Sequence, residues 1–306
     1  MRIKKVKVTL LLVLFAVALV AEPLPVNATS SLIQQNSTIR IRGAGGYPIQ
    51  YTPGNNIFVP FSSDVASGNV IVVAVQVSNG PYTAAAVVSV VDSRGSSFTQ
   101  AVHTSNGPMH AYIYYATLSS SGPDTVTATF NVDLDDYGGF SYLFIYEVSG
   151  VNTTSVATAT GSGTIPNNGP VSTTSTSFEN GAFLVAIMGC DVMTANWEAG
   201  SGFTMSTVLV PFEDTYIQLT RVMYATSGVS SPTTFPATLN HLGDPSDENW
   251  YEAAIALNPA TRPVPNPYHY VGGEVFSANK LAILSPYLAL FSVVAIAAII
   301  VGRKLT

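Results

Sequence analysis

The sequence predicts an all-β fold: an antiparallel β-sandwich built from an internal duplication, plus one C-terminal transmembrane helix. Runs rich in Val, Ile, Thr, Tyr and Phe alternate with clusters of Gly, Pro, Asn, Asp and Ser. No window between Ser30 and Asn258 shows the periodicity of a helix. A set of short motifs also recurs at a spacing of about 110 residues.

The chain begins with a predicted signal peptide, residues 1–28. Four cations lie within the first seven residues, and an apolar stretch from Val8 to Ala21 follows. This order is typical of a secretory signal, and the apolar stretch is shorter than the roughly 20 residues of a membrane span. Cleavage after Ala28 fits the small residues there. Cleavage after Ala21 and an uncleaved anchor are the alternatives.

Residues 29–258 form the predicted sandwich. Its expected strands follow the β-rich runs and end at turn-forming clusters. They are Ile57–Phe61, Asn69–Ser78, Ala85–Asp92, Phe98–His103, Ala111–Leu118, Thr125–Asn131, Ser141–Ser149, Phe183–Cys190, Thr204–Val210, Ile217–Ala225, Thr234–Leu239 and Glu252–Leu257.

Collinear motif pairs predict that the sandwich is a duplication, with halves at about residues 65–150 and 178–258. The matches include the Gly-Ser-x-Phe-Thr motifs that end at Thr99 and Thr204 and the Tyr-Ala-Thr motifs that begin at Tyr115 and Tyr224. The halves could form two separate small sandwiches. They could also interleave into one jelly roll with a single core, and we favour this second arrangement.

The C-terminal part contains a stalk and an anchor. Four prolines lie between Pro259 and Pro267, which predicts a stiff stalk over residues 259–280. Leu281–Val301 has 21 residues without a charge, enough to cross a bilayer as a helix. Arg303 and Lys304 lie in the tail, residues 302–306, and favour a cytoplasmic C-terminus with the sandwich outside.

The segment from Asn279 to Tyr287 resembles the C-terminal anchors of archaeal cell-surface proteins. The shared pattern is Asn-Lys-Leu, a few apolar residues, Pro-Tyr and an apolar helix that ends in Arg-Lys. We favour retention of this anchor over its removal by a sortase-like enzyme. The resemblance implies a location in the cell membrane with an extracellular ectodomain.

Residues 60–258 are similar to secreted bacterial and archaeal β-sandwich modules of the lectin-like jelly-roll type. The similarity lies in the Val-Val-Asp-Ser-Arg-Gly-Ser-Ser-Phe stretch that ends at Phe98, in Ile113–Ala116, and in the closing segment Asn249–Ala256. It implies a surface location and a fold. It does not imply a specific chemistry.

The charge distribution excludes some classes of partner. Residues 29–279 contain five cations against 17 carboxylates, a net charge of −12, and no lysine lies between Val8 and Asn279. Such an acidic ectodomain argues against nucleic acid and against an anionic membrane surface. Glycans and other surface proteins are the expected partners, besides the membrane that holds the C-terminal span.

Two acidic loops are candidate metal sites, and no other cofactor is implied by any motif. One contains Asp133, Asp135 and Asp136, and the other contains Asp244 and Asp247. Closely spaced carboxylates suit calcium, although neither loop has the spacing of a known calcium loop. Because Asp also favours turns, solvated turns are the alternative.

Few residues in the sequence have the types and spacing of a catalytic site. Glu147 and Glu252 lie in the last long strand of each half, and two carboxylates on one sheet face would suit a polysaccharide hydrolase. Glu147 could instead pair with an arginine such as Arg221. His103 and His110 flank one predicted hairpin and are expected to be neighbours. The single cysteine, Cys190, is interpreted as a buried core residue and not as a catalytic thiol.

Three surface features complete the candidates. Asn36 and Asn152 begin Asn-x-Ser/Thr sequons in expected turn-rich segments, so both are candidate glycosylation sites. Trp197 lies in an expected loop and is a candidate ligand-contact residue, whereas Trp250 is expected in the core.

These observations favour a non-enzymatic cell-surface module for adhesion, glycan binding or envelope structure. One alternative is a surface polysaccharide hydrolase that uses Glu147 and Glu252. The other is a pilus-like subunit, which requires the N-terminal segment Ser31–Arg42 to remain unpaired and free to join a neighbour's sheet.

Overall fold

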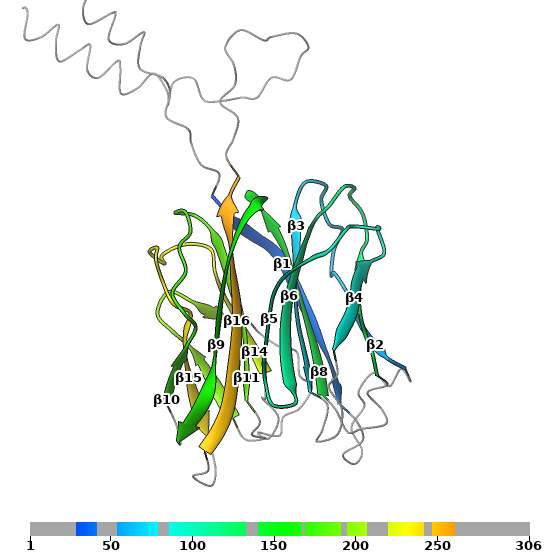
Figure 1. Ribbon diagram of the computed structural model, residues 1–306. Helices are drawn as coiled ribbons and strands as arrows, with labels where there is room; N and C mark the ends of the chain where they lie inside the picture. The colour runs from blue at the N-terminus through cyan, green and yellow to red at the C-terminus, as the bar shows by residue number, and fades with distance from the viewer. Residues whose placement is uncertain are drawn as a thin grey trace, which may run out of the picture. The chain divides into compact units, whose positions relative to one another are not determined.

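The fold is all-β, as predicted (Figure 1). A computed structural model describes residues 29–41, 54–78, 86–132, 140–166, 169–190, 195–206, 220–241 and 247–260. These residues form sixteen strands and no helix, and every strand pair in the sheets is antiparallel.

The first eight strands form one sandwich. A five-stranded sheet in the order β1-β8-β3-β6-β5 faces a three-stranded sheet in the order β2-β7-β4. The strands are β1 (Ser31–Ile41), β2 (Asn56–Pro60), β3 (Val70–Ser78), β4 (Val87–Asp92), β5 (Thr99–Asn106), β6 (Met109–Thr117), β7 (Thr125–Phe130) and β8 (Phe140–Ser149).

The last eight strands form a second sandwich with the same strand order. Its five-stranded sheet is β9-β16-β11-β14-β13 and its three-stranded sheet is β10-β15-β12, so adding eight to each number of the first sandwich gives the second. The strands are β9 (Val151–Pro166), β10 (Gly169–Ser172), β11 (Phe183–Cys190), β12 (Ala195–Ala199), β13 (Thr204–Met205), β14 (Thr220–Ala225), β15 (Pro236–His241) and β16 (Asp247–Pro259).

This repeated order supports the duplication but corrects the arrangement that we favoured. Each half closes its own sandwich, and the halves do not interleave into one. Only Gly150 separates β8 from β9, and its φ of 72° lies in the left-handed region that favours glycine. The strands of each half pair among themselves, so the long strand β9 opens the second sandwich instead of joining the first.

Burial patterns explain why the two kinds of sheet have different sequences. In β7, buried and half-buried residues alternate, because one face of the three-stranded sheet meets the core and the other meets solvent. All eight residues of β11 are buried. A strand buried on both faces has a nearly continuous apolar run, which shows that the five-stranded sheets are covered on both sides.

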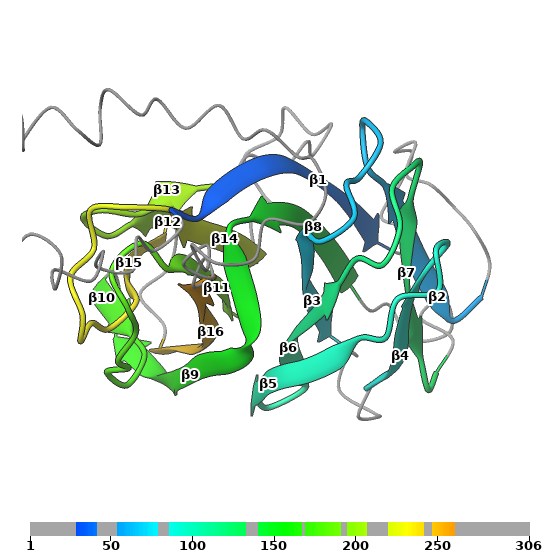
Figure 2. The ribbon, with the colours of Figure 1, turned by 90° about the horizontal axis from the view of Figure 1, so that it is seen from above.

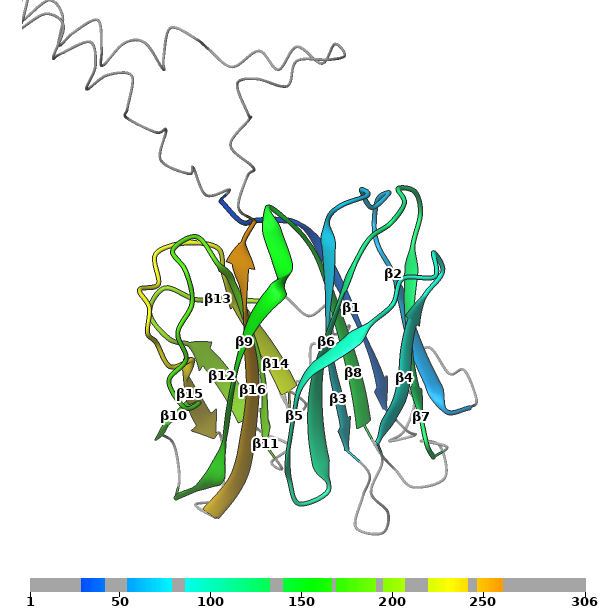
Figure 3. The same ribbon diagram turned by 45° about the horizontal axis from the view of Figure 1, so that its top comes forward.

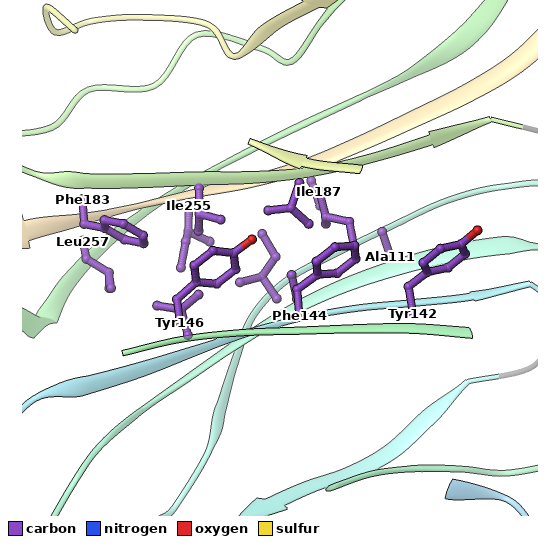
Figure 4. Close-up of a cluster of buried hydrophobic side chains, with 14 of the residues drawn as sticks. Ala111, Tyr142, Phe144, Tyr146, Phe183, Ile187, Ile255 and Leu257 are labelled. Carbon is purple, nitrogen blue, oxygen red and sulfur yellow. The ribbon is translucent and has the colours of Figure 1, made fainter. Parts of the chain in front are cut away.

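The second cover of each five-stranded sheet is the other five-stranded sheet. One cluster of buried side chains combines Tyr142, Phe144 and Tyr146 of β8 with residues of β11 and β16, such as Phe183 and Ile255 (Figure 4). We call it the middle core. The two other clusters fill the first and second sandwiches separately, and we call them the first core and the second core.

The register defines equivalent positions in the two halves, which we call sister positions. Tyr115 pairs with Thr99 and Val72, as Tyr224 pairs with Thr204 and Val185. In the same frame Tyr142 is the sister of Tyr251, and both belong to the middle core. The two halves therefore place equivalent faces against each other.

Edge strands reinforce this contact. Gln35 of β1 accepts a hydrogen bond from the Ser206 hydroxyl, just after β13, at 2.8 Å. At the opposite seam Asn106 of β5 donates to the Gly163 carbonyl of β9 at 3.0 Å. Figures 2 and 3 show β1 extending from the second sandwich to pair with β8 of the first. β1 and β9 are sister strands, and so are β5 and β13. Exchanging the two sandwiches therefore turns one of these contacts into the other, as in a two-fold symmetric pair.

Candidate functional site

Glu147 is a structural carboxylate inside the first sandwich. It is fully buried and pairs with Ile71, whose side chain lies in the first core. Its oxygens accept hydrogen bonds from Gln34 Nε2 at 2.7 Å, Ala66 N at 2.8 Å and Asn69 Nδ2 at 2.6 Å. These partners tie the segment before β3 to β1, and Arg221 is not among them.

In the second half a different residue makes the equivalent hydrogen-bonded connection. The sister of Glu147 is Ala256, which has no polar side chain. Two residues further along β16, Asn258 Oδ1 accepts the Glu179 N–H at 2.8 Å. Asn258 therefore holds the segment before β11, as Glu147 holds the segment before β3, so this role of Glu147 is structural.

Glu252 faces the second sandwich and does not meet Glu147. It pairs with Met188, a residue of the second core, so the middle core lies between the two carboxyls. The predicted two-carboxylate face is therefore not formed. Glu252 is fully buried, and neither of its oxygens has a hydrogen-bond partner. Burial raises its pKa well above the usual range.

Trp197 is a core residue, which corrects its expected role as an exposed contact. It lies on β12, pairs with Leu239 and is only 3% exposed. Its polar sequence neighbours suggested a loop, but the segment is a strand with one face directed into the core. Cys190 is buried, as predicted, and Trp250 packs against the second core.

The predicted calcium loops are largely outside the described residues. Asp133, Asp135, Asp136 and Asp244 lie there, while Asp247 is the first residue of β16. Within the part of the chain that the structure describes, no three His, Cys, Asp or Glu side chains form a metal-binding group. The loops stay a prediction.

The two sequon asparagines lie in strands and make local hydrogen bonds. Asn36 of β1 donates through Nδ2 to the Pro60 carbonyl at 2.8 Å. Asn152 of β9 donates to the Pro259 carbonyl at 2.9 Å and accepts from the Thr154 hydroxyl at 3.1 Å. Glycosylation replaces one of the two amide hydrogens, so the bond to the carbonyl persists only when the remaining N–H makes it.

His103 and His110 are neighbours, as predicted from the hairpin. His103 Nε2 lies 3.1 Å from His110 Nδ1, and the two rings are nearly parallel at 5°. Burial lowers the pKa of both, and the charge of His103 lowers that of His110 further. When both are neutral, the N–H of one imidazole therefore donates a hydrogen bond to the unprotonated ring nitrogen of the other.

A hydroxyl-lined pocket lies at the seam between the sandwiches. It is bounded by the turn before β5, by the end of β6 and by the start of β9. Its lining residues are uncharged, and seven of the nine carry a hydroxyl. The nine are Gly95, Ser96, Ser97, Thr99, Tyr115, Ala116, Thr117, Ser119 and Thr153.

The pocket has a defined framework. Thr99 and Tyr115 are cross-strand neighbours, and Tyr115 also packs against the middle core. The Thr117 and Thr153 hydroxyl oxygens, which belong to different sandwiches, lie 3.3 Å apart. The pocket therefore includes residues of both sandwiches. The pocket could not be recognised from the sequence, because Ser and Thr are frequent throughout this chain.

The N-terminal segment does not stay free for a neighbour. Strand β1 pairs with β8 from Ser31 to Ile41. The feature that the pilus-like alternative requires is therefore absent from this strand. Nowhere in the described ranges is there a helix long and apolar enough to cross a membrane, and Leu281–Val301 lies outside those ranges.

Fold and site together define an all-β protein with two sister sandwiches and a polar pocket at their seam. The sequence matches no protein-family model. It also matches no curated protein.

Proposed function

We propose that this chain is a non-enzymatic cell-surface module that binds glycans in the hydroxyl-lined pocket at the seam. The pocket is the observation that carries the proposal. Its hydroxyls can both donate to and accept from sugar hydroxyls, and Tyr115 supplies an aromatic ring of the kind that packs against sugars. An uncharged lining favours neutral sugars over anionic ones.

The remainder of the proposal follows from the sequence and the strand order. Each sandwich has eight strands in two sheets, the strand number of a jelly roll. The signal-like residues 1–28 and the apolar span 281–301 support display of the sandwiches outside the cell membrane, with the C-terminus in the cytoplasm. Adhesion through a displayed glycan site is consistent with this arrangement.

A hydrolase function has less support. Its two acids, Glu147 and Glu252, face different cores, and Glu147 already holds three donors. A retaining or inverting glycosidase needs its carboxyls within about 10 Å across one sugar.

A glycan array tests the proposal. Residues 29–262 are suitable, because all three cores lie within this compact unit. We expect binding of neutral glycans that is lost when Thr99 is changed to Val. Thr204→Val is the matched control, because Thr204 is also exposed and pairs with the sister tyrosine Tyr224.

The array is run both with calcium chloride and with EDTA. Equal loss in the Thr99→Val and Thr204→Val variants would show that the pocket is not the site. No binding in either condition would refute the proposal and favour a structural role in the envelope.

A further inference from the structure

Two buried carboxyl groups lie near each other at one end of the first sandwich. Asp92 ends β4 and is 8% exposed, and Asp124 precedes β7 and is 4% exposed. Asp92 pairs with Val126, so it is a diagonal neighbour of Asp124 on the face that carries the first core. Burial raises the pKa of Asp124, and the charge of Asp92 raises it further.

In each carboxyl group only one oxygen accepts hydrogen bonds. Asp92 Oδ1 accepts the N–H groups of Arg94 at 3.1 Å and Ser96 at 2.7 Å. Asp124 Oδ1 accepts the Ser93 hydroxyl and the Thr125 N–H, both at 2.8 Å. The two Oδ2 atoms are buried and have no hydrogen-bond partner.

Arg94, two residues after Asp92, directs its guanidinium to other partners. Arg94 donates through Nε to the Ser120 hydroxyl at 3.0 Å and through a terminal nitrogen to the Pro123 carbonyl at 3.3 Å. A further oxygen is available: the Ser96 hydroxyl is also buried without a partner, and the Ser96 N–H holds that residue beside Asp92. Buried anionic oxygens without donors are costly unless a cation compensates them.

The second sandwich shows that the fold does not require carboxyls here. In both sandwiches the turn after the edge strand donates to the first residue of the central strand: Ser93 N to Thr125 O, and Gly200 N to Pro236 O. The residues that flank this bond in the second sandwich are Ala199 and Phe235, and Phe235 is fully buried. The same corner therefore closes with apolar residues.

We propose that Asp92 and Asp124 bind one calcium ion at this corner. Their Oδ2 atoms and the Ser96 hydroxyl supply hard oxygen ligands, and water completes the six to eight ligands that calcium takes. Ser96 also lines the seam pocket, so the ion would lie beside the proposed glycan site, although the calcium proposal does not depend on glycan binding.

The test is thermal unfolding of the full-length chain in EDTA and in calcium chloride. We expect calcium to raise the midpoint by at least about 3 °C in the wild type, since an ion that binds only the folded state stabilises it. The Asp92→Asn and Asp124→Asn variants should lose this shift. Without calcium they should be no less stable than the wild type, because each change removes charge repulsion.

Two control variants locate the ion. Asp64→Asn changes an exposed acid near Asp124, and Asp135→Asn changes the acidic loop, so both should keep the calcium shift. A shift that is lost in Asp135→Asn and kept in Asp92→Asn would place the ion in the loop and overturn the proposal. The proposal would also be overturned if each variant, Asp92→Asn or Asp124→Asn, were destabilised by the same amount with and without calcium. A purely structural role predicts that result.

A direct binding measurement guards against variants that fail to fold. Equilibrium dialysis of the full-length wild type with calcium chloride alone should give about one bound ion that the Asp92→Ala variant lacks. This variant copies Ala199 of the second sandwich and is the change most compatible with the corner. No bound calcium in the wild type at millimolar concentration would overturn the proposal.

Discussion

Replacing Glu252 with leucine should stabilise the protein. Glu252 is fully buried, and neither carboxyl oxygen has a partner, so the folded state bears its desolvation cost without compensation. An unsatisfied buried polar group costs about 1–3 kcal/mol. Leucine has a similar size and occupies the sister position, Leu143, in the first core. We therefore expect the free energy of unfolding to rise by about 1–3 kcal/mol in Glu252→Leu.

The pH dependence gives a second signature of the same residue. The folded pKa of Glu252 lies above its ordinary value of 4.5. Between these two values the folded state keeps its proton and the unfolded state releases it, so stability falls as pH rises through this range. Below 4.5 both states are protonated and the effect disappears. The Glu252→Leu variant should lack this component, and its advantage over the wild type should grow from pH 4 towards neutrality.

Urea unfolding followed by tryptophan fluorescence is a suitable assay. Both tryptophans of the chain, Trp197 and Trp250, contact the second core where Glu252 lies. The matched control is Glu147→Leu. It removes an equally buried carboxyl that accepts three hydrogen bonds, so it should destabilise by about 1–3 kcal/mol for each donor left unpaired. A lower midpoint for Glu252→Leu, or losses of the same sign in both variants, would refute the reasoning.

Two further predictions concern other buried or paired groups. Gly189→Ala should destabilise by about 1–3 kcal/mol, because a methyl group there would overlap the buried Tyr251 hydroxyl; an unchanged urea midpoint would contradict this. The pKa values of His103 and His110 are lowered, so the unfolded state takes up protons first and stability should fall as pH drops below 6.5. Replacing both histidines with glutamine should reduce this fall in unfolding titrations, and an unchanged slope would show that the pair does not contribute.

Much of the fold could be predicted because β-rich runs and turn residues repeat along the chain. The expected strand Phe183–Cys190 agrees with β11, and the expected Ser141–Ser149 lies within β8. Strand β9 was missed, since its sixteen residues are rich in Thr, Ser and Gly and carry little apolar alternation. An edge strand of this kind takes its conformation from pairing with β16, which local sequence does not encode.

The arrangement of the halves could not be derived from the repeat alone. A continuous apolar run such as that of β3 indicates burial on both faces but does not say what covers the second face. Here the cover is the sister sheet, through a core that includes Tyr142 and Tyr251. That the Glu252 carboxyl has no hydrogen-bond partner could not be predicted either, because the sequence shows an acid in a strand and not its surroundings.

The seam pocket could not be predicted from the sequence for a related reason. Its residues come from three segments of the chain, of which β9 was not predicted. By contrast, the proximity of His103 and His110 followed from one hairpin, since a short loop fixes which residues are cross-strand neighbours. Local constellations were therefore predictable, and constellations between the two halves were not.

The middle core is expected to join the two sandwiches into one cooperative unit that holds the seam pocket. Hydrogen exchange of amides in β3 and β11 measures this coupling, because these strands are central to different sandwiches. Phe144→Ala removes a large side chain from the middle core and should cost about 3–5 kcal/mol. We predict that the variant lowers the protection of both strands by the same free energy. A loss confined to β3, with β11 unchanged, would contradict the claim.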